Sequence, residues 1–180
     1  MTGQIRIKDD GRLLVLDYEH FLAYHGGGAL AGAAIGFRAM EYAGTVLSRK
    51  NLWDRKNLSV TTWHSGPGVR DAIEYVTRCV TREKFLVDEQ QAKEGSCASE
   101  VAFHFTVSDG RQQVVITMRT GVVARKFLDA VRRFQEDGGT GREREEFEAL
   151  KADVAVKVMA KPLEELFTMA LTVKAVPEHA

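Results

Sequence analysis

One stretch of the chain, from Ala29 to about Leu47, constrains the fold more than any other. Its apolar residues recur at intervals of three and four, a spacing that predicts a helix with one apolar face. Three small residues, Ala31, Gly32 and Gly36, lie among them and would allow another backbone to approach closely. We therefore expect this helix at the centre of the domain or against a second subunit, and a homodimer is the expected assembly.

The rest of the chain predicts short strands alternating with helices. The Asp-Gly pairs at 10–11 and 109–110 are typical of tight turns; the first lies within a possible hairpin over 5–16 and the second joins two strands. Strands are expected over 58–63, 84–87, 101–107, 114–118 and 171–176, and helices over 17–23, 69–80, 127–134, 142–159 and from Pro162. The pattern predicts an α+β fold, formed as a single domain over residues 1–180.

Charge and length exclude several classes of protein. The 25 basic residues balance 25 acidic ones, so the whole chain has no electrostatic reason to bind nucleic acid or an anionic membrane. No apolar run reaches the roughly 20 residues that a membrane span needs, and the first residues lack a signal pattern. We expect a cytoplasmic protein without a membrane partner.

Only two cysteines are present, Cys79 and Cys97, and they form no Cys-x-x-Cys pair. Neither a disulfide framework nor a zinc site made of cysteines alone can be built from them. Any metal site must therefore depend on histidines and at most one or two sulfurs.

Two loops join a histidine to glycines at the start of a helix: 24–28, Tyr-His-Gly-Gly-Gly, and 63–68, Trp-His-Ser-Gly-Pro-Gly. Free amides at a helix N-terminus attract anions, and glycines let a ligand come close to the backbone. The two loops together predict a pocket, with Tyr24, His25, Gly27, Gly28, Trp63 and His64 as its candidate residues.

Each candidate also has a purely structural interpretation. His64, at a strand end, is of a kind that is often partly exposed and bonded to a carbonyl, and His25 could simply cap its flexible loop. Cys79, on an apolar helical face, would then be a buried small hydrophobe. No Walker loop, dinucleotide fingerprint, His-Glu-x-x-His motif or nucleophile elbow is present, so no catalytic residue is assigned and whether the protein is an enzyme stays open.

Two blocks of sequence resemble the FmdE family, a family named for formylmethanofuran dehydrogenase. The segment from Tyr24-His25-Gly26 to Gly36-Phe37-Arg38-Ala39-Met40-Glu41 is similar to the family's opening loop and Gly-Tyr-Arg-Ala helix. The second block, Asp71-Ala72-Ile73 and Thr77-Arg78-Cys79, is similar to its Asp-Ala-Ile and Thr-Gly-Cys segments. The resemblance covers most of the chain, up to a helix like 162–167. It implies an FmdE-like fold, a central and mainly antiparallel sheet packed with the long small-residue helix and further helices.

The departures from the family pattern bear on function. The opening loop's second histidine and its Cys-Pro are replaced, Gly68 stands where the family has a cysteine, and no cysteine-rich zinc ribbon follows. The resemblance implies a metal held by the His/Cys loop, for which His25, Cys79 and the additional His64 remain. Imidazole suits zinc, nickel, copper or iron.

A haem with His25 or His64 as axial ligand is the alternative cofactor, with Tyr24, Trp63, Phe37 and Met40 as apolar walls. The family's association with molybdenum or tungsten formylmethanofuran dehydrogenase operons implies a metal- or metallocofactor-binding module, accessory to anaerobic redox metabolism and to a redox-enzyme partner. Two further hypotheses are an enzyme in which a histidine-bound metal activates water and a structural relative that binds no metal.

Overall fold

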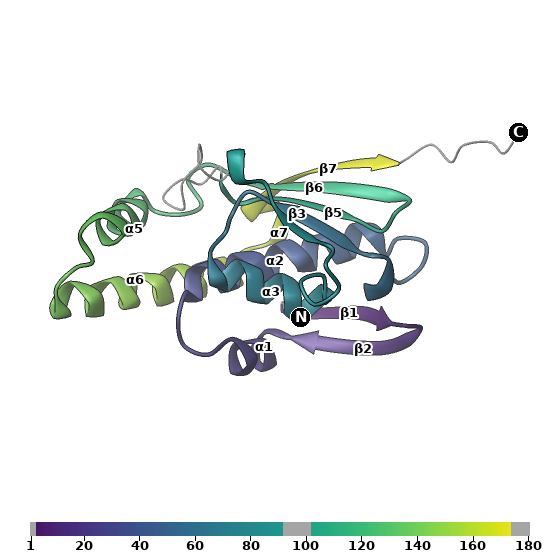
Figure 1. Cartoon of the computed structure of the whole chain (residues 1–180), viewed down its shortest axis with the longest axis horizontal. Helices are drawn as coiled ribbons and strands as arrows, with labels where there is room; N and C mark the ends of the chain where they lie inside the picture. Colours follow the sequence, from purple (N-terminus) through teal and green to yellow (C-terminus); the bar gives the residue numbers. More distant parts are fainter. Residues whose placement is uncertain (1–2, 92–101, 174–180) are drawn as a thin grey trace, which may run out of the picture.

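The computed structural model describes residues 3–91 and 102–173 and has three layers (Figure 1). A five-stranded sheet forms the first layer, two helices, α2 and α3, pack beneath it, and a two-stranded hairpin with α1 lies on their other side. The mixed α+β fold agrees with the expectation from the sequence.

The first element is a hairpin of β1 (Gln4–Asp9) and β2 (Arg12–Asp17). Its loop consists of Asp10 and Gly11, and both have positive φ, 51° and 82°, as a tight two-residue turn requires. Asp17 then accepts a hydrogen bond from the amide of His20 at 2.9 Å and caps α1 (Tyr18–His25). The turn was predicted from the sequence, as was a helix that begins near Asp17.

Helix α2 (Leu30–Leu47) is the buried centre of the molecule, and its small residues contact other parts of the same chain. A Cβ added to Gly36 would lie 2.9 Å from the Cβ of Ala72 on α3 (Pro67–Thr77), and one on Gly44 would lie 2.9 Å from the ring of Trp53. The small-residue side therefore serves close packing within the chain. A second subunit would need another surface.

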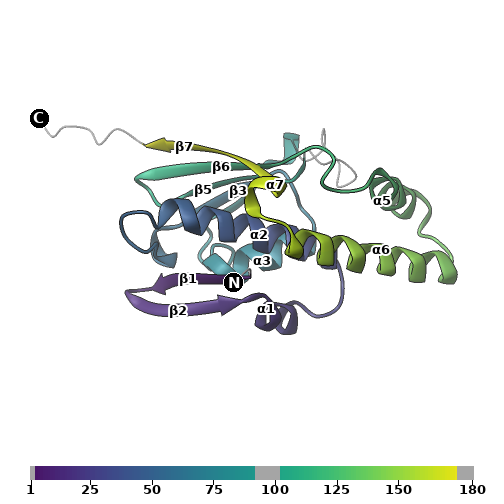
Figure 2. The ribbon, with the colours of Figure 1, turned by 180° about the vertical axis from the view of Figure 1, so that it is seen from behind.

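The large sheet has the order β4-β3-β5-β6-β7, and Figure 2 labels β3, β5, β6 and β7. Its strands are β3 (Ser59–Thr62), β4 (Phe85–Val87), β5 (His104–Ser108), β6 (Gln112–Met118) and β7 (Phe167–Val173). Only the β3–β4 pairing is parallel; the other pairings, as far as the chain is described, are antiparallel. This matches the predicted, mainly antiparallel sheet.

Helices α5 (Arg125–Asp137) and α6 (Gly141–Ala160) form an arm that extends past the end of the sheet (Figures 1 and 2). Near its C-terminus α6 buries Val154, Ala155 and Val158 in the core, whereas its N-terminal half packs against α5. The short helix α7 (Leu163–Leu166) leads from α6 into β7.

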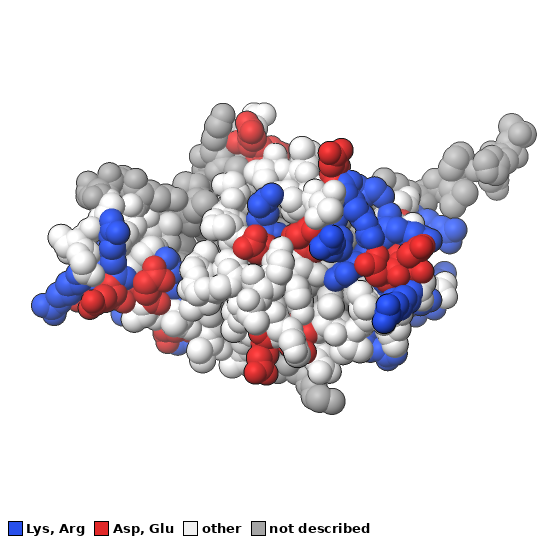
Figure 3. All heavy atoms as spheres, turned by 60° about the horizontal axis from the view of Figure 1, so that its bottom comes forward, with Lys and Arg blue, Asp and Glu red and all other residues white. Residues whose placement is uncertain are grey.

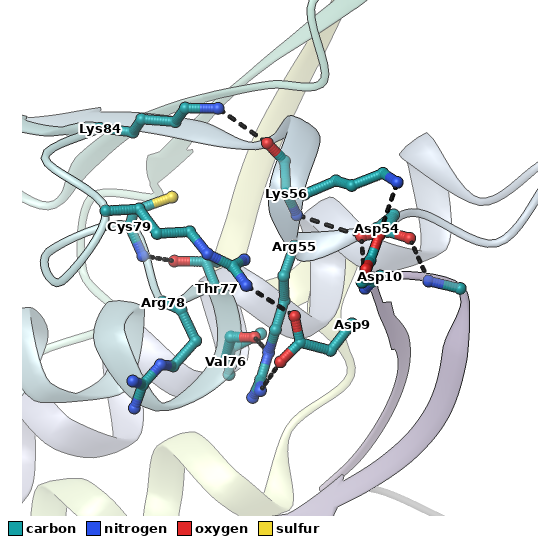
Figure 4. A network of polar contacts seen from close by, with 12 residues as sticks. Asp9, Asp10, Asp54, Arg55, Lys56, Val76, Thr77, Arg78, Cys79 and Lys84 are labelled. Carbon is teal, nitrogen blue, oxygen red and sulfur yellow. Dashed lines mark hydrogen bonds and ion pairs between the residues drawn. The ribbon is translucent and has the colours of Figure 1, made fainter.

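A polar network fixes the hairpin to the end of α3 (Figure 4). Arg55, in the short 3₁₀ helix η1 (Arg55–Asn57), donates through Nε to the carbonyl of Val76 at 2.8 Å and through Nη2 to the carbonyl of Tyr75 at 2.6 Å. Its Nη1 lies 3.3 Å from Asp9, which also accepts from Arg82 at 2.7 Å. The hydrogen bond from Arg82 is the main cause that lowers the pKa of Asp9.

On the face formed by the hairpin and α1, charged side chains gather toward the two ends and leave a largely uncharged area between them (Figure 3). Within the described ranges, 3–91 and 102–173, no helix has the length and apolar content needed to cross a bilayer.

Most predicted boundaries lie within two or three residues of those observed, with two informative differences. Helix α3 begins at Pro67, two residues before the predicted start. It ends at Thr77, three residues before the predicted end, because Arg78 adopts a left-handed conformation with φ of 59°. Strand β7 begins at Phe167 rather than Leu171 because α7 is only one turn long. Cys97, the first residue of the strand predicted over 101–107 and the end of the strand predicted over 171–176 fall outside the described residues.

Candidate ligand-binding site

An apolar cavity of about 280 Å³ lies where the α5–α6 arm meets the starts of α2 and α3. Its described lining comes from the loop after β3, from both helix starts and from the arm. The lining residues are Ala29, Ala31, Gly32, His64, Gly66, Pro67, Gly68, Phe103, Phe127, Val131, Phe134, Phe147 and Lys151. The second histidine loop contributes to this lining, with the arm as the opposite wall, and of the six candidate pocket residues only His64 is among the described lining residues.

His64 is the most constrained polar group of the cavity. Its side chain is stacked on Phe103, with ring centroids 4.5 Å apart, and the residue is only 7% exposed. Burial lowers the pKa of His64 to about 4, so the ring is neutral at pH 7. Nδ1 accepts a hydrogen bond from the amide of Gly66 at 3.0 Å, which places the proton on Nε2. The neutral ring is thus a hydrogen-bond donor through Nε2.

Two glycines let the backbone approach closely at this site. A Cβ on Gly66 would overlap the Cε1 atom of the His64 ring. A Cβ on Gly68 would lie 2.5 Å from the carbonyl oxygen of Ala29 and 2.6 Å from the amide of Ala33. Position 68, where the FmdE pattern has a cysteine, has no room for any side chain, because α2 and α3 touch there.

The arm supplies an aromatic wall. Phe134 of α5 stacks on Phe147 of α6 with centroids 4.5 Å apart, and Phe127 lies 6.0 Å from Phe147. The Nζ atom of Lys151 lies 4.4 Å from the centroid of the Phe147 ring and 2.7 Å from Glu148. In the sequence these phenylalanines indicated only the apolar faces of two separate helices. Because two consecutive amphipathic helices must cover their apolar faces, the pattern could have indicated that the two helices pack against each other and form a wall.

His25 lies outside the lining of this cavity. Its Nδ1 is 2.8 Å from the Asp71 carboxylate on α3, and its Nε2 contacts the carbonyl oxygen of Gly28. The ring also stacks on Phe21, with centroids 5.7 Å apart. Both ring nitrogens therefore already face oxygen acceptors, and His25 and His64 do not share the described cavity.

Cys79 is at the other end of α3 from His64. The helix has 11 residues, so it separates the two by about 16 Å along its axis. The Cys79 thiol is buried and donates to the carbonyl of Leu58 at 3.4 Å, and burial raises its pKa. Among the side chains of residues 3–91 and 102–173, no group of three or more from His, Cys, Asp and Glu is placed to hold a metal ion. The set His25, His64 and Cys79 is thus not brought together.

The other candidates lie outside the described lining of the cavity. Tyr24 is 54% exposed and packs against Tyr75, and Trp63 stacks on His104 with centroids 3.8 Å apart. Gly27 and Gly28 are exposed in their loop. The expected walls Phe37 and Met40 are instead fully buried in the core.

Fold and cavity together define a mixed α+β protein with an apolar ligand-sized site between its core and a helical arm. The chain belongs to the FmdE family: the family model, described as "FmdE, Molybdenum formylmethanofuran dehydrogenase operon", matches residues 24–168. A search of curated proteins gave no match. The matched range includes both histidine loops, α2, α3 and the whole arm.

Proposed function

We propose that the protein is a cofactor-binding module of FmdE type that holds a metallocofactor or another small cofactor in the His64 cavity. Membership of a family described by the molybdenum formylmethanofuran dehydrogenase operon supports a role as an accessory to a redox enzyme of anaerobic metabolism. The observation that carries the proposal is a cavity of about 280 Å³ that combines aromatic walls with one buried imidazole. Ligand sites usually have this composition.

A bare metal ion does not fit the cavity well. His64 offers only Nε2, and ligation there would require the proton to move to Nδ1 and the hydrogen bond from Gly66 to break. Cys79 lies at the far end of α3 and cannot contribute. A cofactor that carries its own ligands needs at most one contact from the protein, so it suits this site better than free zinc, nickel or iron.

Metal binding at His25 is a second candidate, favoured by its contact with Asp71. A carboxylate on the second nitrogen is the usual support of a metal-ligating histidine. The carbonyl of Gly28 now contacts Nε2, and a metal ion there would have to displace it. Residues 26–28 are exposed, so the loop has space for that movement.

Haem is a less suitable occupant of the cavity as it stands. The volume of the cavity lies just below the range of about 300–1,000 Å³ that is usual for ligand sites. A macrocycle would require the arm to move outward, and His64 would again have to exchange its tautomer. A homodimer, which would have to use a surface other than α2, stays part of the proposal.

Analysis of protein purified without a histidine tag tests the proposal. Metal content, optical spectra and mass spectrometry of the denatured supernatant identify bound groups. Val131→Trp fills the cavity from α5, and Val156→Trp adds the same ring to an exposed position of α6. We expect a bound group in the wild type and in Val156→Trp and its loss from Val131→Trp.

Two other outcomes separate the alternatives. A metal that is lost from His25→Ala but kept in Val131→Trp would move the site to the first loop. Wild-type protein with no bound group, and no uptake from an anaerobic extract of its own host, would favour a structural relative and overturn the proposal.

A further inference from the structure

Two helices begin at the same cavity. Ala29 is the N-cap of α2 and Gly66 the N-cap of α3, and both residues line the cavity. Neither helix start has a side-chain cap. Each helix N-terminus carries about half a positive charge and unbonded amides, so the two make one wall of the cavity electropositive.

His64 adds an independent polar group to the same wall. It is more than nine-tenths buried and lines the cavity, and its Nδ1 is occupied by the amide of Gly66. Its Nε2 has no hydrogen-bond partner among residues 3–91 and 102–173. Nε2 is therefore the ring atom of His64 that is left to donate a hydrogen bond to an acceptor on a ligand.

The charge of the lining has one sign. Lys151 is its charged side chain, and no described lining residue is acidic. Lys151 keeps its contact with Glu148 at the surface while its Nζ lies over the Phe147 ring. The cavity therefore suits a ligand with negative charge.

The remaining wall suits a flat apolar body. Phe103, Phe127, Phe134 and Phe147 present ring faces and edges, the contacts that aromatic ligands prefer. A cavity of about 150 Å³ holds one benzene ring, so the observed volume of about 280 Å³ accommodates one or two fused rings.

We propose that the cavity binds a small planar aromatic carboxylate, with its carboxylate toward His64 Nε2 and the two helix starts and its ring among the phenylalanines. This inference rests on the proposed function and names the class of ligand that the site selects. It makes the negatively charged group, rather than a metal–protein bond, the main determinant of binding.

Three probes with the same naphthalene ring and a substituent of similar size test the charge preference: 2-naphthoate, 2-naphthamide and 2-naphthylmethylamine. Each is titrated into the full chain by calorimetry and by amide NMR. We expect 2-naphthoate to bind about tenfold more tightly than either of the others, with the largest shifts at the amides of Gly66 and Gly68. His64→Phe should weaken 2-naphthoate while keeping the stack on Phe103.

A matched pair of charge variants sharpens the test. Lys151→Gln should weaken 2-naphthoate about threefold to tenfold and leave 2-naphthamide unchanged. Lys157→Gln removes the same charge from an exposed part of α6 and should change neither.

The outcomes separate this inference from the proposed function. Equal binding of 2-naphthoate and 2-naphthamide, both abolished by Val131→Trp, would overturn the carboxylate preference and leave the cavity as the cofactor site. No shift at Gly66 or Gly68 with any probe would also overturn it, and the groups found on untagged protein would then decide the proposed function separately.

Discussion

The ring of His64 accepts a hydrogen bond at Nδ1 from the amide of Gly66, 3.0 Å away, two residues along the same loop. This contact fixes the tautomer of a buried imidazole and turns the loop back toward α3. It also makes position 66 a sensitive glycine of the site, because the ring lies where a side chain would be.

Gly66→Ala should therefore displace the His64 ring and destabilise the fold by about 1–3 kcal/mol, the usual cost of overpacking. Urea unfolding measures this cost. Gly27→Ala is the matched control: the added Cβ would contact nothing within 4 Å, so stability should change little. Equal stability of the two variants would show that the ring is not held against residue 66.

Gly68→Cys restores the residue type of the family pattern, yet we expect it to lower stability by about 2–3 kcal/mol. The new Cβ would lie 2.5 Å from the Ala29 carbonyl, and two backbones would have to separate. Gly32→Ala, whose nearest new contacts are at 3.6 Å, should be neutral or stabilising. A stable Gly68→Cys protein that gains a stoichiometric metal would contradict this expectation.

The unfolding free energy should depend on the protonation of His64. Its pKa is about 4 in the folded protein and 6.5 when unperturbed, so the unfolded state takes up the proton first as pH falls. Stability should be complete above about pH 7 and fall by up to about 3 kcal/mol between pH 6.5 and pH 4.

The difference between wild type and His64→Gln across this pH range isolates the effect from carboxylates that titrate below it. His20→Gln is the control, because His20 is exposed and its hydrogen bond to Asp17 shifts its pKa upward instead. A wild-type profile parallel to that of His64→Gln would mean that the folded ring titrates normally.

Arg55→Met should destabilise the protein by about 3 kcal/mol or more, because it leaves Asp9 and two carbonyls at the end of α3 without a buried guanidinium. Lys56→Met, at the next residue, removes an exposed contact with Asp10 and should cost less than about 1 kcal/mol. Thermal unfolding of the pair measures the difference. Similar losses would show that the network of Figure 4 acts only at the surface.

The sequence predicted the helices, strands and turns well because each of these elements is determined largely by residues close to one another in the chain. Asp10 and Gly11 define their turn alone, and Asp17 caps α1 with its own side chain. The end of α3 was predicted too late, since the apolar stripe continues to Val80 while Arg78 has already left the helical conformation. Nothing in the residue pattern marks that change.

The candidate site was predicted only in part. The second loop does border a pocket, but the orientation of a histidine ring depends on partners far along the chain. Asp71, 46 residues away, turns His25 toward α3, and the stacking of His64 on Phe103 joins separate loops. The phenylalanines of α5 and α6 could not be assigned to the cavity before the docking of the arm was known.

The arm supplies one wall of the cavity, whereas the donors on the opposite wall belong to the central helices and the loop after β3. Apart from the charge of Lys151 on α6, the groups that anchor a ligand's polar end and the groups that limit its size therefore belong to different parts of the chain. Substitutions in α5 could broaden or narrow the range of accepted molecules while the core packing stays as it is, so homologues sharing the donors can differ in what they carry.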